Sequence, residues 1–320
     1  MNTGYRRRNR DLKVFSGNAN LPLAKEICRH LQMPLGKINL TKFSDGEHYC
    51  QILENVRGKD VFIIQPTCCP VNNNLMELLI MIDAFKRSSA ARITSVIPYY
   101  GYARQDRKDK PRVPISSKLV ADLLAAAGTD RILSMDLHAG QIQGFFDIPV
   151  DHLFAEPVLT NYFKSRNIDN LTIVSPDVGN IKRAARYVEH LNGDLAIIHK
   201  RRISSKEVQC AEIIGNVKER NVLMCDDIIS TAGTICSAAK LVKERGAKKI
   251  FIGATHGLFC DDAVNNIKNS PIEEVIVTDT VPLKLKATGL ACIKILTVST
   301  ILGEAIKRIH NNESISSMFK

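Results

Sequence analysis

The chain has 320 residues, of which 45% are hydrophobic and 24% are charged. This length and balance are ordinary for a globular protein of about two domains. No apolar run approaches the roughly 18 residues of a membrane span, and the first residues lack the apolar core of a secretory signal. The nine cysteines include no C-x-x-C pair, so neither a zinc site nor a disulfide framework is indicated, and we expect a cytoplasmic protein.

The net charge of +11 suits polyanionic partners, which are nucleic acid, a membrane surface or small phosphorylated substrates. The basic residues are spread along the chain except in the arm Arg6–Arg10, which we interpret as a solvated tail. No helix-turn-helix, zinc-finger or RNP signature supports nucleic-acid binding. A small-molecule substrate is therefore the favoured partner, with no membrane and with nucleic acid disfavoured.

Strand-like apolar runs alternate with helical patterns along the chain. The strand candidates are Val61–Gln65, Ile93–Pro98, Ile132–Met135, Leu171–Ser175, Leu195–Ile198, Val222–Cys225, Ile250–Ala254 and Glu274–Thr278. The helix candidates are Leu23–Leu31, Leu75–Arg87, Ser116–Ala127, Glu156–Lys164, Asn180–Leu191 and Ile235–Arg245. Such alternation predicts βαβ units, parallel sheets and thus an α/β fold.

One strand–helix–strand pattern occurs twice. The strand at Val61 leads through a helix to the strand at Ile93, and the strand at Val222 leads through a helix to the strand at Ile250. This echo indicates two similar α/β domains with a boundary near residue 155, although generic βαβ spacing would look the same. Only the second copy carries an acidic pair after its first strand.

That acidic pair is the most informative stretch of the sequence. Asp226 and Asp227 directly follow the apolar strand, then come a loop of hydroxyls and glycine over 230–234 and a helix from Ile235. A loop that opens a helix offers free N–H groups and the positive end of the helix dipole to a phosphate. Carboxylates beside it suit sugar hydroxyls or a divalent metal, so we expect a phosphorylated sugar, with an ordinary Asp-rich turn as the alternative.

Further polar runs follow other predicted strands. A charged loop runs from Arg104 to Arg112, His138 follows one strand, Asp177 another, and three cations over 200–202 follow a third. Cations and metal aimed at phosphate oxygens are what phosphoryl or pyrophosphoryl transfer needs. Each run alone is also consistent with a solvated strand end or surface loop, and His138 alone with a structural histidine. The segment Phe43–Glu47 is typical of a turn whose aromatic ring could stack on a base.

Common nucleotide motifs are missing from the sequence. It contains no G-x-x-x-x-G-K-[ST], no G-x-G-x-x-G and no H-E-x-x-H. Ordinary P-loop and Rossmann interpretations therefore lose support.

Together these runs closely resemble the ribose-phosphate pyrophosphokinase family, of the phosphate-activated class, from Leu12 to Phe319. The run Asp136–Asp151 is similar to the family signature, and Tyr102–Lys108 is similar to its flexible catalytic loop. The resemblance implies two tandem type I phosphoribosyltransferase-like domains with parallel sheets flanked by helices. It assigns residues 1–155 to the first domain, with 304–320 packing back on it, and 156–303 to the second.

The resemblance also implies the reaction and its partners. The diphosphoryl group of ATP would pass to the C1 hydroxyl of ribose 5-phosphate, giving 5-phosphoribosyl 1-pyrophosphate and AMP for nucleotide biosynthesis. Mg²⁺ would be the cofactor, with inorganic phosphate and ADP as effectors. A homo-oligomer, a hexamer built from dimers, would be the assembly.

Site residues follow from the matching positions. The catalytic residues would be Lys200 and Arg202. ATP would contact Arg104, Gln105, Asp109 and His138 of its own subunit and Phe43, Asp45 and Glu47 of a neighbour. Ribose 5-phosphate would contact Asp226, Asp227, Ser230, Thr231, Ala232, Gly233 and Thr234. Metal would be held by His138, Asp177, Asp226 and Asp227, and allosteric phosphate by Ser314, Ser316, Arg57 and Arg112.

Four positions depart from the family pattern. Ser230 replaces an Asp of the acidic loop, Asn180 a Gly beside Asp177, and Gly140 and Asn55 each a Ser near the regulatory site. The lost carboxylate at Ser230 predicts weaker sugar binding or slower turnover.

Three rival functions are weighed against the enzyme. The departure at Ser230 is the main support for a non-catalytic regulatory paralogue, but the loop Arg104–Arg112 carries no insertion and the cations at 200–202 are intact. A phosphoribosyltransferase would not need that loop or a second domain of equal size. The hypothesis of a nucleic-acid-binding protein is supported only by the basic arm and the net charge.

Overall fold

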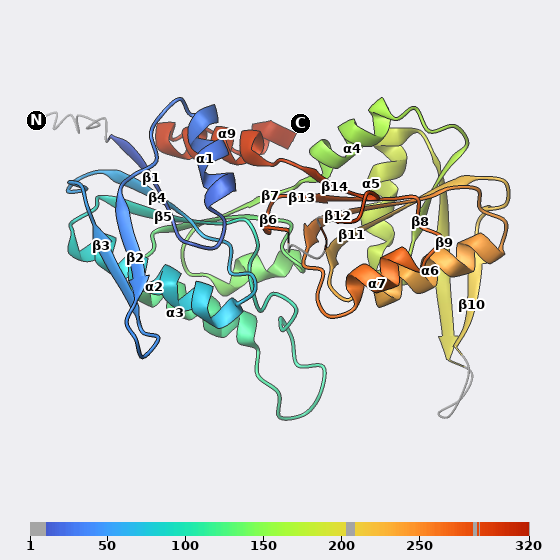
Figure 1. Ribbon diagram of the computed structural model, residues 1–320, viewed down its shortest axis with the longest axis horizontal. Coiled ribbons are helices and arrows are strands. Elements are labelled where there is room, and N and C mark those ends of the chain that lie inside the picture. Colours follow the sequence, from blue (N-terminus) through green and yellow to red (C-terminus); the bar gives the residue numbers. More distant parts are fainter. Residues whose placement is uncertain (1–10, 203–208, 284–286, 288, 320) are drawn as a thin grey trace, which may run out of the picture. The chain divides into compact units, whose positions relative to one another are not determined.

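The computed structural model describes residues 11–202, 209–283, 287 and 289–319, and the side chains of 200–202, 209–211 and 319 are outside the description. The chain divides into two compact units (Figure 1). Unit 1 combines Met1–Leu153 with Ser299–Lys320, and unit 2 is Phe154–Val298. The sequence analysis expected a division after residue 155 and a returning segment from 304. None of the described helices has the length and apolar character of a membrane span.

Unit 1 is built on a five-stranded parallel sheet in the order β1-β4-β5-β6-β7. Its strands are β1 (Leu12–Ser16), β4 (Asp60–Ile64), β5 (Arg92–Ile97), β6 (Arg131–Met135) and β7 (Val150–Leu153). Its helices are α1 (Leu21–His30), α2 (Val71–Arg87), α3 (Ser116–Ala127) and α9 (Ser299–Asn311), with 3-10 turns at Gly140–Phe145 and Ser316–Phe319. Helices α2 and α3 cover one face of the sheet and α1 and α9 cover the other (Figure 1).

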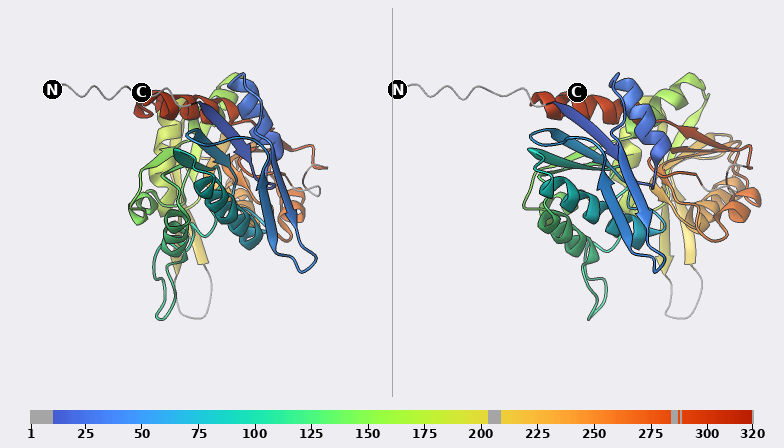
Figure 2. Two further views of the ribbon diagram at one scale, coloured as in Figure 1. Left: turned by 90° about the vertical axis from the view of Figure 1, so that its left-hand side faces the viewer. Right: turned by 60° about the vertical axis from the view of Figure 1, so that its left-hand side comes forward.

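A separate antiparallel pair stands beside this sheet. It consists of β2 (Ile38–Lys42) and β3 (His48–Ile52), in which Lys42 pairs with His48. The two blue strands project from unit 1 and end in the turn at 43–47 (Figure 2). Gly46 has a φ of +96°, which glycine adopts without steric cost. The predicted turn is thus confirmed, although the strands on either side of it were not predicted.

Unit 2 holds a seven-stranded sheet in the order β10-β9-β8-β11-β12-β13-β14, parallel except for β9 with β10. The strands are β8 (Leu171–Ser175), β9 (Asp194–Arg202), β10 (Gln209–Ile214), β11 (Asn221–Ile229), β12 (Ile250–Gly257), β13 (Glu274–Thr278) and β14 (Ile293–Leu296). The helices are α4 (Glu156–Ser165), α5 (Ile181–Leu191), α6 (Gly233–Glu244) and α7 (Ala263–Lys268), with a 3-10 turn at Val178–Asn180. The predicted fold class, α/β with parallel sheets flanked by helices, is confirmed.

Burial of the second sheet on both faces explains its continuous apolar runs. Along β11, Val222 and Met224 belong to a core shared with α6, whereas Leu223 and Cys225 belong to a core shared with Phe163 of α4. Successive side chains of a strand point to opposite faces, so a strand covered on both sides has apolar residues at consecutive positions, as Val222–Cys225 do.

The C-terminal helix is fixed to unit 1 by a buried ion cluster. The Asp60 carboxylate is 1% exposed and accepts from Arg92 Nε at 2.7 Å and Nη2 at 2.5 Å. His310 Nδ1 lies 2.7 Å from the same carboxylate, and Arg92 Nη2 donates to the Ile309 carbonyl at 3.0 Å. Gly303 brings α9 against α1, because a Cβ there would meet the His30 ring at 2.5 Å. The last helix is therefore an integral part of the first unit.

Candidate active site

The acidic pair lies inside β11 and not after it. Asp226 pairs with Ala254 and the strand continues to Ile229, so the sequence analysis was wrong to end the strand at Cys225. Asp227 is 5% exposed. Burial, followed by the neighbouring Asp227 carboxylate, raises the pKa of Asp226 to about 7. A cation or a sugar hydroxyl that binds this pair would relieve the repulsion between the two carboxylates.

Asn180 connects the acidic strand with the end of β8. Its backbone N–H donates to Asp177 Oδ1 at 3.0 Å, and its side-chain Nδ2 donates to Asp226 Oδ1 at 3.3 Å. The same oxygen of Asp226 accepts the N–H of Asp227 at 2.8 Å. The structure thus brings Asp177 and Asp226 into one hydrogen-bonded group, and the residue that departs from the family pattern is the link between them.

The loop after β11 forms the N-terminus of α6. The helix begins at Gly233, two residues earlier than predicted, and its N-cap residue is Ala232 with a φ of +60°. Alanine has no side-chain oxygen that could cap the first N–H groups of a helix, so these groups remain available to a ligand. Thr231, Gly233 and Thr234 are exposed at this point, whereas Ala232 is buried. The predicted order of strand, short loop and helix is confirmed.

In unit 1, the charged segment between β5 and α3 is a loop, as predicted. Gln105 anchors its beginning, because its Oε1 accepts from Ser116 Oγ at 2.6 Å and its carbonyl accepts from the Ser117 N–H at 3.2 Å. Asp106 Oδ2 accepts from Gln141 Nε2 at 3.2 Å, which ties the loop to the 3-10 turn after β6. Sequence reasoning missed Ser116 and Gln141, because contacts across 11 and 35 residues leave no local signal.

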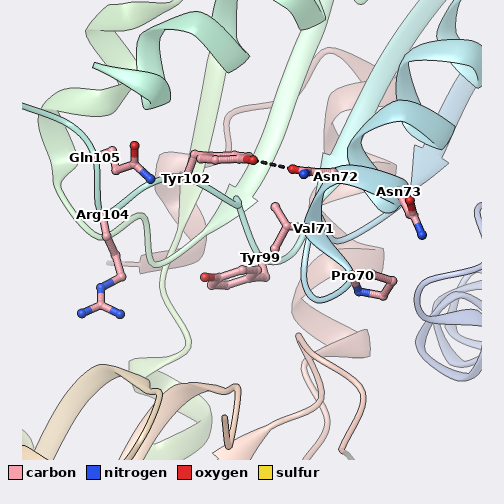
Figure 3. A pocket seen from close by; sticks show the side chains of 8 residues that line it. All are labelled: Pro70, Val71, Asn72, Asn73, Tyr99, Tyr102, Arg104 and Gln105. Atoms are coloured by element: carbon pink, nitrogen blue, oxygen red, sulfur yellow. Dashed lines mark hydrogen bonds between the residues drawn. The ribbon is translucent and has the colours of Figure 1, made fainter. Parts of the chain in front are cut away.

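A pocket of about 560 Å³ opens beside the start of this loop, where Arg104 and Gln105 meet the N-terminus of α2 (Figure 3). The Tyr102 hydroxyl donates to Asn72 across it, and the Arg104 guanidinium extends away from the loop backbone (Figure 3). The lining residues are Pro70, Val71, Asn72, Asn73, Tyr99, Tyr102, Arg104 and Gln105. A planar amide, aromatic faces and a guanidinium are groups that can bind a base and a phosphate.

Other predicted ATP contacts of unit 1 lie at its surface. Asp109 is exposed in the loop, and His138 is exposed three residues after β6 ends. At the hairpin turn, Asp45 Oδ1 accepts the N–H of Glu47 at 3.1 Å, and the Phe43 ring is 55% exposed and packs edge-on against Tyr49. An aromatic ring held out in this way is available to a neighbouring molecule.

Lys200 and Arg202 lie in β9, where they pair with Ala211 and Gln209 of β10. Their side chains lie outside the described part of the chain. The catalytic role of these two residues therefore stays a prediction.

The residues predicted to bind allosteric phosphate lie in several segments of unit 1. Ser314 and Ser316 follow α9 and are exposed, as are Arg57 and Arg112. Arg308 holds the serine segment, since its Nη1 donates to the Ser314 carbonyl at 3.1 Å and to Ser317 Oγ at 2.5 Å. Sequence reasoning missed Arg308, because it did not predict α9, whose last turn contains this residue.

Two of the family departures lie near these segments. The side chain of Asn55 accepts the N–H of Arg57 at 3.0 Å, as a turn-forming Asn does. Gly140 begins the 3-10 turn after β6, and a Cβ at this position would meet open space. Neither change therefore distorts the local backbone.

The described residues do not preassemble a complete metal site. Within the described ranges, no group of three or more His, Cys, Asp or Glu side chains gathers around a point. Mg²⁺ is usually held by one or two carboxylates together with substrate phosphates and water. The oxygen donors of Asp177, Asp226 and Asp227 fit such a cation without a larger set.

Comparison with known proteins assigns the chain to a family. Residues 12–128 match the family model of the N-terminal domain of ribose phosphate pyrophosphokinase, and residues 201–320 match that of the phosphoribosyl synthetase-associated domain. The ribose-phosphate pyrophosphokinase of Rhodopirellula baltica is 56% identical over 97% of this chain and 99% of its own, and that of Helicobacter pylori J99 is 51% identical over 99% and 98%.

A solved structure agrees with these relatives. The phosphoribosylpyrophosphate synthetase from Mycobacterium smegmatis is 41% identical, has a TM-score of 0.90 and is matched over 95% of this chain and 100% of that chain. The chain therefore belongs to the ribose-phosphate pyrophosphokinase family.

Proposed function

We propose that the protein transfers the diphosphoryl group of ATP to the C1 hydroxyl of ribose 5-phosphate, giving 5-phosphoribosyl 1-pyrophosphate and AMP. One observation carries the proposal. Strand β11, which contains the two aspartates, is followed within a few residues by the N-terminus of α6, where no side chain caps the first N–H groups. Carboxylates accept hydrogen bonds from sugar hydroxyls, and a helix N-terminus binds phosphate. The relatives from Rhodopirellula baltica and Helicobacter pylori carry the name of the enzyme, which disfavours a regulatory paralogue.

Unit 2 is the proposed site for ribose 5-phosphate. Asp226 and Asp227 bind the ribose hydroxyls, and the segment 230–234 binds the 5-phosphate through its backbone N–H groups and the hydroxyls of Ser230, Thr231 and Thr234. Fixing both ends of the sugar orients the C1 hydroxyl for attack. Orientation of this kind can supply much of the rate enhancement of a group transfer.

Unit 1 is the proposed site for ATP. Arg104, Gln105, Asp109 and His138 contact the nucleotide of the same subunit, and the pocket lined by Arg104 and Gln105 supports this assignment. The turn at 43–47 contacts the nucleotide of a neighbouring subunit through Phe43, Asp45 and Glu47. The exposed Phe43 ring supports this second assignment and with it a homo-oligomer, for which we propose a hexamer.

In the proposed reaction, the C1 oxygen attacks the β-phosphorus of ATP and loses its proton, while the bond from the β-phosphorus to the oxygen of AMP breaks. Lys200 and Arg202 stabilise the charge that develops on the transferring group. Asp177, Asp226, Asp227 and His138 are the proposed contacts of Mg²⁺, which, when bound, neutralises phosphate oxygens.

Regulation and location complete the proposal. Inorganic phosphate activates by binding at Ser314, Ser316, Arg57 and Arg112, and ADP competes for the same region. The eight described cysteines form no disulfide with one another, which fits the reducing cytoplasm.

The test is AMP formation from ATP and Mg²⁺, with and without ribose 5-phosphate, at low and high phosphate. We expect AMP release that depends on the sugar, is absent with unphosphorylated ribose, and increases with phosphate. Asp226→Ala should abolish it, and Asp169→Ala, at an exposed carboxylate before β8, should not. A folded wild-type protein that releases no sugar-dependent AMP would disprove the proposal.

A further inference from the structure

The loop that precedes α6 is backed by the chain segment that follows β12. Three consecutive carbonyls, the last of β11 and the first two of the loop, accept hydrogen bonds from this segment. The Ile229 carbonyl accepts from the Leu258 N–H at 2.9 Å, and the Ser230 carbonyl accepts from the Cys260 N–H at 2.9 Å. The Thr231 carbonyl accepts from the side-chain Nδ2 of Asn266 at 3.0 Å. Asn266 is thus the side chain that completes a row otherwise made by backbone donors.

Peptide geometry converts this row into a binding surface. In a trans peptide, the N–H of a residue points opposite to the carbonyl of the residue before it. When the three carbonyls turn toward the segment after β12, the N–H groups of Ser230, Thr231 and Ala232 turn the other way. Successive N–H groups directed to one side form a concavity that binds anions.

The last peptide of the row, between Thr231 and Ala232, is followed by a residue in an unfavourable backbone conformation. Ala232 has a φ of +60°, a left-handed conformation that is unfavourable for any residue with a Cβ. The Asn266 amide holds the peptide between Thr231 and Ala232 from outside and thereby stabilises this conformation.

Asn266 is itself held in place by the core. It belongs to α7, whose Ala263 and Ile267 are buried in the same apolar cluster as Ala232 and Ile235. Its backbone N–H donates to the Asp262 carbonyl at 2.8 Å. The amide therefore reaches the loop from a rigid base, while its neighbour Asn265 is exposed on the same helix.

We infer that Asn266 is a positioning residue for the 5-phosphate of the sugar. It orients the peptide between Thr231 and Ala232 so that the Ala232 N–H faces the phosphate, and it does not touch the ligand itself. This inference rests on the proposed function, because it assumes that the loop binds a sugar phosphate.

The test compares substitutions at two neighbouring positions of α7. Asn266→Ala removes the donor, and we expect the Kd for ribose 5-phosphate in calorimetry to rise roughly three- to tenfold, as for loss of one neutral hydrogen bond. Asn266→Asp should weaken binding further, because a carboxylate repels the Thr231 carbonyl. Asn265→Ala and Asn265→Asp should leave the Kd unchanged, which controls for helix propensity and charge.

Two further readouts separate positioning from a structural role. The KM for ATP and the melting temperature of Asn266→Ala should match those of Asn265→Ala. Adding Ala232→Gly to Asn266→Ala should recover part of the affinity, because glycine adopts the left-handed conformation without support. A wild-type-like Kd in Asn266→Ala, or equal losses for ATP and sugar, would overturn the inference while the proposed function stands. A wild-type protein that neither binds ribose 5-phosphate nor releases AMP would overturn both.

Discussion

The buried carboxylate of Asp60 offers the strongest test of how unit 1 is stabilised. It accepts two bonds from Arg92 and lies 2.7 Å from His310 Nδ1, at 1% exposure. Asp60→Asn keeps the size of the side chain but removes its charge and one acceptor oxygen. Arg92 is then left with a side chain only 18% exposed and no carboxylate to neutralise it.

The expected loss follows from these contacts. Breaking a buried ion pair by removing one partner costs about 3–5 kcal/mol. The lower end applies to this pair, because Arg92 keeps its bond to the Ile309 carbonyl and some access to water. At roughly 3 °C per kcal/mol for a unit of this size, Tm should fall by about 9 °C.

The assay is thermal unfolding followed by circular dichroism, with Asp122→Asn as the matched control. Asp122 pairs with Lys118 on the exposed face of α3, where an ion pair contributes about 0–1 kcal/mol. The double variant Asp60→Asn/Arg92→Met leaves no uncompensated Asp60 or Arg92 charge. Its decrease in Tm should therefore be smaller than the sum of the decreases in the two single variants. If Asp60→Asn melts within about 2 °C of Asp122→Asn, the stabilising role of the cluster is refuted.

Three further predictions concern unit 2. Ser230→Asp restores the carboxylate of the family loop and should raise kcat/KM for ribose 5-phosphate in steady-state assays; an unchanged value would show that the lost carboxylate is unimportant. Asn180→Gly removes the donor to Asp226 and should weaken Mn²⁺ binding about fivefold in a direct titration. The control Asn192→Gly, at the other end of α5, should leave the affinity for Mn²⁺ unchanged. Equal affinities of the two variants would contradict the role of Asn180 as the link between Asp177 and Asp226. In the folded protein Asp226 keeps its proton up to about pH 7, whereas in the unfolded chain it releases the proton near its ordinary pKa of 3.8. The stability that the folded state gains from this proton is therefore complete below about pH 4 and is lost as the pH rises to about 7. In metal-free chemical denaturation, the wild type should therefore lose stability relative to Asp226→Asn across this range; a constant difference would exclude the raised pKa.

Much of the fold could be predicted because burial shapes the sequence directly. Strands β8 and β13 and helix α3 have the bounds expected from their apolar patterns. The end of β11 could not be predicted, because aspartates are uncommon in strands. The strand is extended by pairing with β12, in which Asp226 pairs with Ala254, Ile228 with His256 and Ile229 with Gly257. Likewise α9 was missed, since Gly303 in a helix is unfavourable until the close contact with His30 is known.

In the candidate site, too, some residues could be predicted from the local sequence and others could not. Residue type and order predicted Asp226, Thr231 and their neighbours as site residues, because an acidic pair and a hydroxyl-rich loop before a helix are local features of the chain. The residues that hold these groups in place, such as Asn180 and Asn266, act across 46 and 35 residues of sequence. Their roles depend on which loops the fold brings together, and no local pattern carries that information.

The discontinuous make-up of unit 1 has a consequence for synthesis on the ribosome. Unit 2 is one continuous segment and can fold as soon as it emerges, whereas unit 1 must wait for α9, whose Leu302, Ile306 and Ile309 belong to its core. The first half of the polypeptide is thus the last to reach its native state. A premature stop near residue 298 would leave the second unit whole and remove α9 from the first, so that Asp60 would lose His310 and Arg92 would lose the Ile309 carbonyl.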